Sequence, residues 1–163
     1  MNYATAADMV ERFGERELIQ LTDRDDTGGI NPGSVNRALA DATAFADGYL
    51  GRIYQLPLRG CAKPPATVGA EVTYVAPPVL TRLVCDLARY YLMPDVGDKH
   101  EAVNRYKAAT KDLQALADGT TQLACPWGGT AGDSLHANAL QEAEVYHSFA
   151  PGQMNADNLR GFA

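Results

Sequence analysis

The strongest constraint on the fold is a set of apolar residues between positions 32 and 54 that recurs every three or four residues. This spacing places them on one face of an α-helix of about five turns. Asn31 is a good N-cap, and Pro32 suits the first helical position. The apolar stripe consists of Val35, Leu39, Ala42, Ala46, Tyr49, Leu50 and Ile53. The sequence therefore predicts a long amphipathic helix with one buried face.

Three further segments have helical patterns and can cover that face. The segment 79–93 follows two prolines and carries the widest apolar face, so we expect it at the centre of the core. Gly14 interrupts the N-terminal segment, and the last segment ends before Gly119. The pattern predicts a mainly α fold with a small four-helix core, formed by about residues 5–21, 32–54, 79–93 and 99–118.

Residues 59–76 form an arm between the second and third predicted helices. Pro64 and Pro65 exclude a helix there, whereas Val68, Val72 and Tyr74 fall on one side of a possible strand over 68–75. A projecting hairpin or extended arm with one strand is predicted, and an ordered surface loop is the alternative. Because unpaired strand edges take partners, the arm is expected to pair or pack against another protein chain.

The chain changes character after Gly119. Residues 120–163 contain one Arg and four acidic residues, and prolines and glycines interrupt any long element. Large apolar residues are sparse, so we expect this segment to leave its own core and dock elsewhere. The predicted organisation is a helical core at 1–119, which includes the arm 59–76, and a C-terminal interaction tail at 120–163.

Composition excludes some functions. The chain has 163 residues and a net charge of −6, so it lacks a bulk electrostatic attraction to nucleic acid. No apolar stretch is long enough to span a bilayer. Residues 1–5 lack a basic segment followed by an apolar run, so no secretory signal is expected. A free-standing nucleic-acid-binding protein is the class that these features disfavour most.

No residue pattern predicts catalysis. The chain contains no Walker loop, no G-x-S-x-G and no H-E-x-x-H. Cys61, Cys85 and Cys125 include no C-x-x-C pair, so we expect free thiols in a reducing compartment. We therefore expect no enzymatic activity, no cofactor and no metal site.

Three charged residues share one face of the segment 79–93. Arg82, Asp86 and Arg89 are separated by four and three residues. They form either a salt-bridged stripe within the subunit or an ion pair between subunits.

Four short blocks, in order, resemble a known family. They are YATAAD at 3–8 with FGERELIQLTD at 13–23; ALADA at 38–42 with DGYL at 47–50 and YQLPL at 54–58; PPVL at 77–80 with LVCDLARY at 83–90; and NLRGF at 158–162. Together they resemble the Mu-like prophage family of small head–tail joining proteins, long catalogued as a domain of unknown function. The chain departs from the family pattern at 59–75, because related chains pass from Leu-Pro-Leu to Pro-Pro within a few residues.

The resemblance implies a structural virion protein: a head–tail connector (adaptor) subunit in a homo-oligomeric ring, usually a dodecamer, in the phage neck. The implied partners are identical subunits, the portal protein and the next neck protein, a tail-terminator or stopper. DNA would pass through the lumen without specific binding, and the protein would be made in the bacterial cytoplasm. The alternative is a soluble assembly factor or binding module that acts as a monomer.

The expected interface residues combine this resemblance with the apolar and charged patterns above. They are Arg82, Asp86, Arg89, Val68, Val72, Tyr74, Trp127, Phe149, Leu159, Arg160 and Phe162. In the last three, two apolar anchors and one cation lie within four residues, and aromatic and Arg side chains often dominate binding energy.

Overall fold

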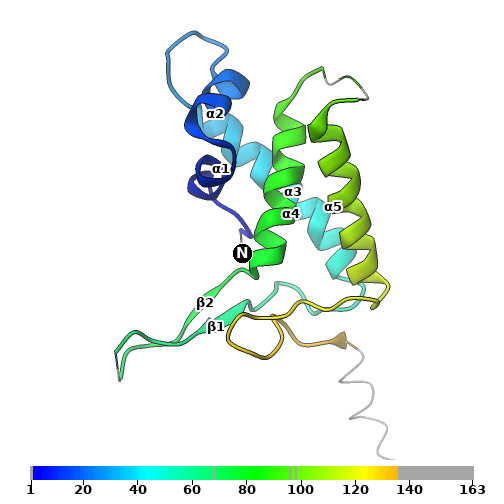
Figure 1. Cartoon of the computed structure of the whole chain (residues 1–163). Helices are drawn as coiled ribbons and strands as arrows, with labels where there is room; N and C mark the ends of the chain where they lie inside the picture. Colours follow the sequence, from blue (N-terminus) through cyan, green and yellow to red (C-terminus); the bar gives the residue numbers. More distant parts are fainter. Residues whose placement is uncertain (1, 68, 96, 98, 136–163) are drawn as a thin grey trace, which may run out of the picture.

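The computed structural model describes residues 2–67, 69–95, 97 and 99–135 (Figure 1). Its elements are α1 (Ala6–Phe13), α2 (Glu15–Thr22), α3 (Pro32–Leu50), β1 (Cys61–Lys63), β2 (Thr73–Val75), α4 (Pro78–Leu92) and α5 (Glu101–Ala117). The mainly α prediction is confirmed for these residues. The predicted first helix is two helices, because Gly14 between them has φ +86°, a conformation that a helix does not contain.

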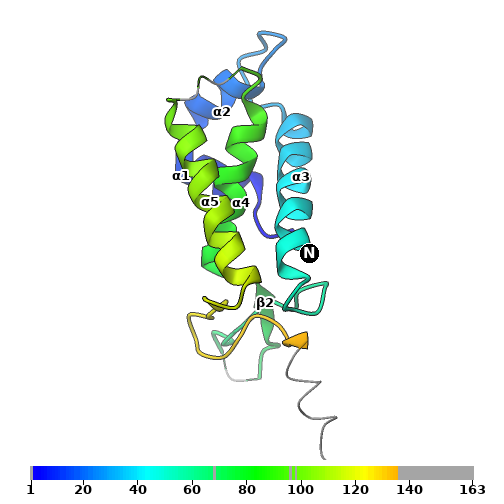
Figure 2. The same ribbon diagram turned by 90° about the vertical axis from the view of Figure 1, so that its right-hand side faces the viewer.

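The core forms where α3, α4 and α5 pack side by side, with α4 between the other two (Figure 2). Helix α4 has the most buried side chains of the described helices, among them the fully buried Leu80, Leu83, Val84 and Leu87. Burying each such side chain contributes about 1.5–3 kcal/mol. The central position predicted for this helix is therefore confirmed.

The start of α3 is fixed by a side-chain cap. The Oδ1 atom of Asn31 accepts a hydrogen bond from the backbone N–H of Ser34 at 3.2 Å, and Pro32 occupies the first helical position. The Asn31→Ala variant should therefore lose about 1 kcal/mol of unfolding free energy, measured by urea denaturation. The Asn31→Asp variant keeps the acceptor and should stay close to wild type. Equal losses in both variants would contradict a role for the cap.

The arm forms a short antiparallel hairpin. Strands β1 and β2 pair Cys61 with Val75, Ala62 with Tyr74 and Lys63 with Thr73, and the hairpin projects from the end of the helical body (Figure 1). The strand predicted at 68–75 is limited to the last three residues. Pairing ends at Lys63 because Pro64, the next residue, has no backbone N–H to donate.

Residues 120–135 fold back onto their own chain, contrary to the prediction for the start of the tail. Leu123 is fully buried, and its N–H donates to the hydroxyl of Tyr54 at 3.0 Å. Further along, the N–H of Gly60 donates to the carbonyl of Ala131 at 2.8 Å. Backbone hydrogen bonds of Asp133 with Gln55 and of Leu135 with Ile53 add to the buried Leu123 in holding this segment. The remainder of the predicted tail lies outside the described residues.

A disulfide joins β1 to this returning segment. Cys61 and Cys125 are bonded, with their Cα atoms 5.4 Å apart, and Cys85 is a free, buried thiol in α4. The prediction of three free cysteines is therefore wrong. The two partners are 64 residues apart in sequence, and only the folding of 120–135 against the arm brings them together.

Candidate interaction surface

The exposed large apolar side chains of the described residues gather at one end of the molecule. They come from the segment before β1, from the hairpin, from the first turn of α4 and from 120–135, all at the lower end of Figure 1. They are Leu56, Val72, Tyr74, Val79, Trp127 and Leu135. We call this region, together with Arg59 and Lys63, the hairpin end. Grouped exposed apolar residues mark interaction surfaces.

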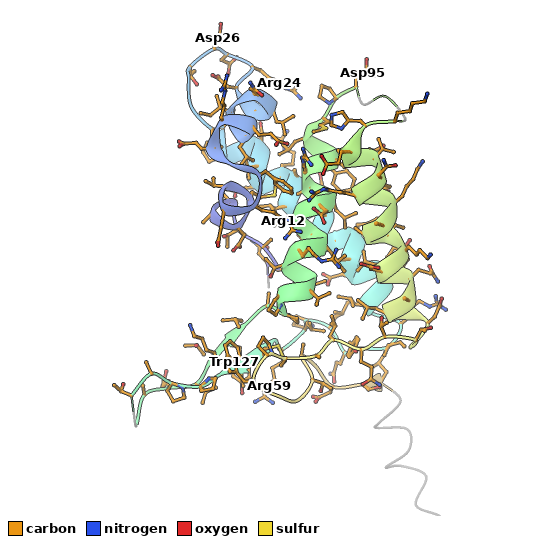
Figure 3. All side chains as sticks on the ribbon, viewed as in Figure 1. Arg12, Arg24, Asp26, Arg59, Asp95 and Trp127 are labelled. Atoms are coloured by element: carbon orange, nitrogen blue, oxygen red, sulfur yellow. A yellow bond between two sulfur atoms is a disulfide. The ribbon has the colours of Figure 1, made fainter. Side chains whose placement is uncertain are left out.

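Trp127 is held at the tip of a tight turn. The N–H of Gly128 donates to the carbonyl of Cys125 at 3.0 Å, and the N–H of Cys125 donates to the carbonyl of Gly129 at 3.2 Å. The disulfide ties the same Cys125 to β1, yet the indole stays 46% exposed (Figure 3). A rigidly presented Trp loses little conformational entropy on binding and is a common hot-spot residue.

Tyr74 is also held in place while exposed. The guanidinium of Arg59 lies 4.8 Å from the centre of the Tyr74 ring, and its Nη2 donates to the Tyr74 hydroxyl at 2.6 Å. Val72 is half exposed in the same hairpin. Of the residues predicted for the interface, Val72, Tyr74 and Trp127 thus share one end of the molecule, although their binding role stays a prediction.

The charged residues of α4 form ion pairs with other helices of the same subunit. Asp86, only 4% exposed, lies between Arg12 of α1 at 3.4 Å and Arg105 of α5 at 3.6 Å. Arg82 pairs with Asp112 of α5 at 2.8 Å.

Arg89 is mostly buried. Its Nε donates to the carboxylate of Glu17 in α2 at 2.6 Å, and its guanidinium lies 4.8 Å from the centre of the Phe13 ring. The spacing on α4 predicted a shared face, but the counter-ions come from three different helices. A contact of these residues with another subunit stays a prediction.

The exposed ion pair between Arg82 of α4 and Asp112 of α5 should contribute little to the free energy of unfolding. Both side chains of the Arg82–Asp112 pair are at least 40% exposed. A double-mutant cycle with Arg82→Ala and Asp112→Ala should therefore give a coupling energy of about 0.2–1 kcal/mol. Thermal or urea unfolding of the four proteins measures it. A coupling well above this range would mean that the pair is less solvated than its exposure indicates.

Comparison with known proteins places the chain in a family. Residues 3–141 match the family described as Bacteriophage Mu, Gp36. The chain belongs to this family. It is 32% identical over 122 residues to "Gene product J" of Escherichia phage Mu, covering 74% of this chain and 75% of the relative. It is 27% identical over 125 residues, 74% of each chain, to the Mu-like prophage FluMu protein gp36 of Haemophilus influenzae.

This Mu Gp36 family member shows neither a metal centre nor a membrane span in the part of the chain that the structure describes. No group of three or more His, Cys, Asp or Glu side chains there could hold a metal ion. None of the helices there is both long and apolar enough to cross a bilayer. Five predicted interface residues of the family member lie outside the described residues: Val68, Phe149, Leu159, Arg160 and Phe162.

Sequence analysis of the family member missed five residues of the hairpin end. Leu56, Val79 and Leu135 are exposed apolar residues, Arg59 stacks on Tyr74, and Lys63 is an exposed cation in β1. No local sequence signal sets Leu56 and Val79 apart from core residues: each adjoins a proline, but so does Leu58, which is buried.

The cysteines of this Gp36 family member can be counted by alkylation. Burial raises the pKa of the Cys85 thiol to about 12, so it carries little reactive thiolate at neutral pH. We expect no labelling of the native protein at neutral pH, one label per chain in denaturant without reductant, and three after reduction, measured by mass spectrometry. Three labels in denaturant without reductant would contradict the disulfide.

Proposed function

We propose that this chain is a head–tail connector (adaptor) subunit that forms a ring between the portal and the tail of a long-tailed phage. The observation that carries the proposal is the concentration of exposed apolar residues at the hairpin end, where the disulfide holds Trp127 in place. A subunit with exposed apolar residues at one end can bury them against neighbouring proteins in an assembly. Membership of the Mu Gp36 family and the sequence resemblance to head–tail joining proteins support the same role.

A connector subunit acts through its shape and through the number of copies in the ring, and the proposed role includes no catalytic step. Contacts between two different patches of identical subunits generate a ring when the rotation closes. A net charge of −6 per subunit favours a lumen that repels DNA, which suits a conduit without specific binding. The proposed partners are identical subunits, usually twelve, the portal protein, and a stopper or tail-terminator protein.

A monomeric assembly factor is the second candidate. The observation that favours it is that the described helices close their core within one chain, with Asp86 and Arg89 buried and paired inside the subunit. Such a core does not need neighbours to fold.

Deletion of the gene from an inducible prophage tests the proposed role. A connector subunit is required for joining, so the lysate should contain filled heads and complete tails that remain separate, as seen by electron microscopy. Adding the purified protein to that lysate should restore joined particles. Heads that fail to form or to fill would instead indicate an earlier assembly role.

A further inference from the structure

We propose that the subunits join head to tail, with the hairpin end of one copy seated in a groove between α1 and the start of α4 on the next copy. This inference rests on the proposed ring and names the two surfaces that form it. The hairpin end and the groove are different patches of the same chain, so the contact is of the type that propagates around a ring.

The groove has a volume of about 450 Å³ and is open to solvent. Ala76 and Pro78, at the root of the hairpin, contribute its apolar part, and Asp8 and Glu11 of α1 contribute carboxylates. A recess of this size can take one aromatic side chain against Ala76 and Pro78, and a buried aromatic ring is a large contact.

The cations in the groove are already paired within the subunit. Arg12 lies 3.4 Å from the carboxylate of Asp86, and Arg82 lies 2.8 Å from that of Asp112. No ion pair from Asp8 or Glu11 to a cation occurs among the contacts of residues 2–67, 69–95, 97 and 99–135. Asp8 Oδ2 already accepts hydrogen bonds from the N–H and the hydroxyl of Thr5, both at 2.7 Å. The groove therefore presents the carboxylate of Glu11, and the other oxygen of Asp8, to an incoming cation.

The hairpin end has the complementary character. Arg59 stacks on the exposed Tyr74, and neither Arg59 nor Lys63 forms an ion pair with a carboxylate among the described contacts. Residues 59–76 contain these two cations and one acid, whereas the charges of the groove that have no counter-ion among the described contacts, Asp8 and Glu11, are both negative. The hairpin end and the groove are therefore complementary in charge.

Within one subunit the hairpin end does not fill the groove. Trp127 remains 46% exposed and does not line the groove, and the hairpin projects away from its own root (Figure 1). A second copy can therefore supply an aromatic side chain to the groove and cations to Asp8 and Glu11.

The test uses two variants, each of which removes one surface. Trp127→Ala disables the hairpin end, and Glu11→Lys disables the groove; both side chains are exposed, so the fold should persist, as checked by circular dichroism. Asp25→Lys, an equal charge change in an exposed loop outside the groove, is the matched control. Sedimentation velocity over a concentration series measures self-association. We expect it to be at least about tenfold weaker than wild type for the first two variants and equal to wild type for the control.

Mixing the two variants gives the decisive result. A 1:1 mixture of Trp127→Ala and Glu11→Lys retains one intact hairpin end and one intact groove, so it should form heterodimers with wild-type affinity but nothing larger. If Trp127→Ala misfolds, Lys63→Glu replaces it in the mixture, and if Glu11→Lys misfolds, Glu11→Gln replaces it. A mixture that stays monomeric, or a wild-type chain that does not self-associate, would overturn the inference. The proposed neck role would still be decided separately, by the copy number in particles.

Discussion

Replacing both Cys61 and Cys125 with serine should lower the free energy of unfolding by about 2–4 kcal/mol. The disulfide closes a loop between residues 64 positions apart, so its loss increases the freedom of the unfolded chain. It also removes the covalent tie between β1 and 120–135, the segment that buries Leu123 and carries Trp127. Urea denaturation of the variant and the wild type under non-reducing conditions measures the loss.

Reduction provides the control for this prediction. Wild type in dithiothreitol should lose about as much stability as the double serine variant, and the variant itself should not respond to the reductant. Wild-type denaturation curves that coincide with and without reductant would contradict a structural role for the bond.

Replacing Arg89 with alanine should lower the free energy of unfolding by about 2–3 kcal/mol, because its guanidinium joins α4 to both N-terminal helices. Its charged hydrogen bond to Glu17 contributes about 1.5–3 kcal/mol, and its contact with the Phe13 ring about 0.5–2 kcal/mol. These two contributions share one side chain and do not add in full. Chemical denaturation measures the loss.

Two matched variants separate the contributions of Arg89. Glu17→Gln keeps the shape of the partner and removes its charge, so it should cost about 1 kcal/mol. Arg89→Lys keeps the charge but loses the planar donor that fits both partners, so it should fall between wild type and Arg89→Ala. An Arg89→Ala protein within about 0.5 kcal/mol of wild type would show that the contacts of Arg89 contribute little to holding α1 and α2 on α4.

Local signals predicted the helices well. The apolar period between 32 and 54, the cap at Asn31 and the break at Gly14 each act within a few residues, so they can be recognised without knowledge of the fold. The hairpin was recognisable for the same reason, although Pro64 makes its strands shorter than the alternation at 68–75 predicted.

Contacts between distant segments could not be predicted. Nothing near Cys61 or Cys125 indicates that the two meet, because that depends on the backbone pairing of 53–60 with 131–135. Likewise, the spacing on α4 placed Asp86 on a helix face but could not indicate that α1 and α5 supply its counter-ions. The exposure of Trp127 depends on the same returning segment, so sequence analysis could name the residue but not its setting.

The copy number of the chain in purified phage particles tests the central claim most directly. Quantitative mass spectrometry with isotope-labelled reference peptides, calibrated against the major capsid protein, measures this number. A connector subunit should be present in every particle at one fixed number, near the twelve copies usual for such rings, and should remain with the neck when heads and tails are separated. A chain that is abundant in the lysate but absent from purified particles would contradict the account and favour the monomeric assembly factor.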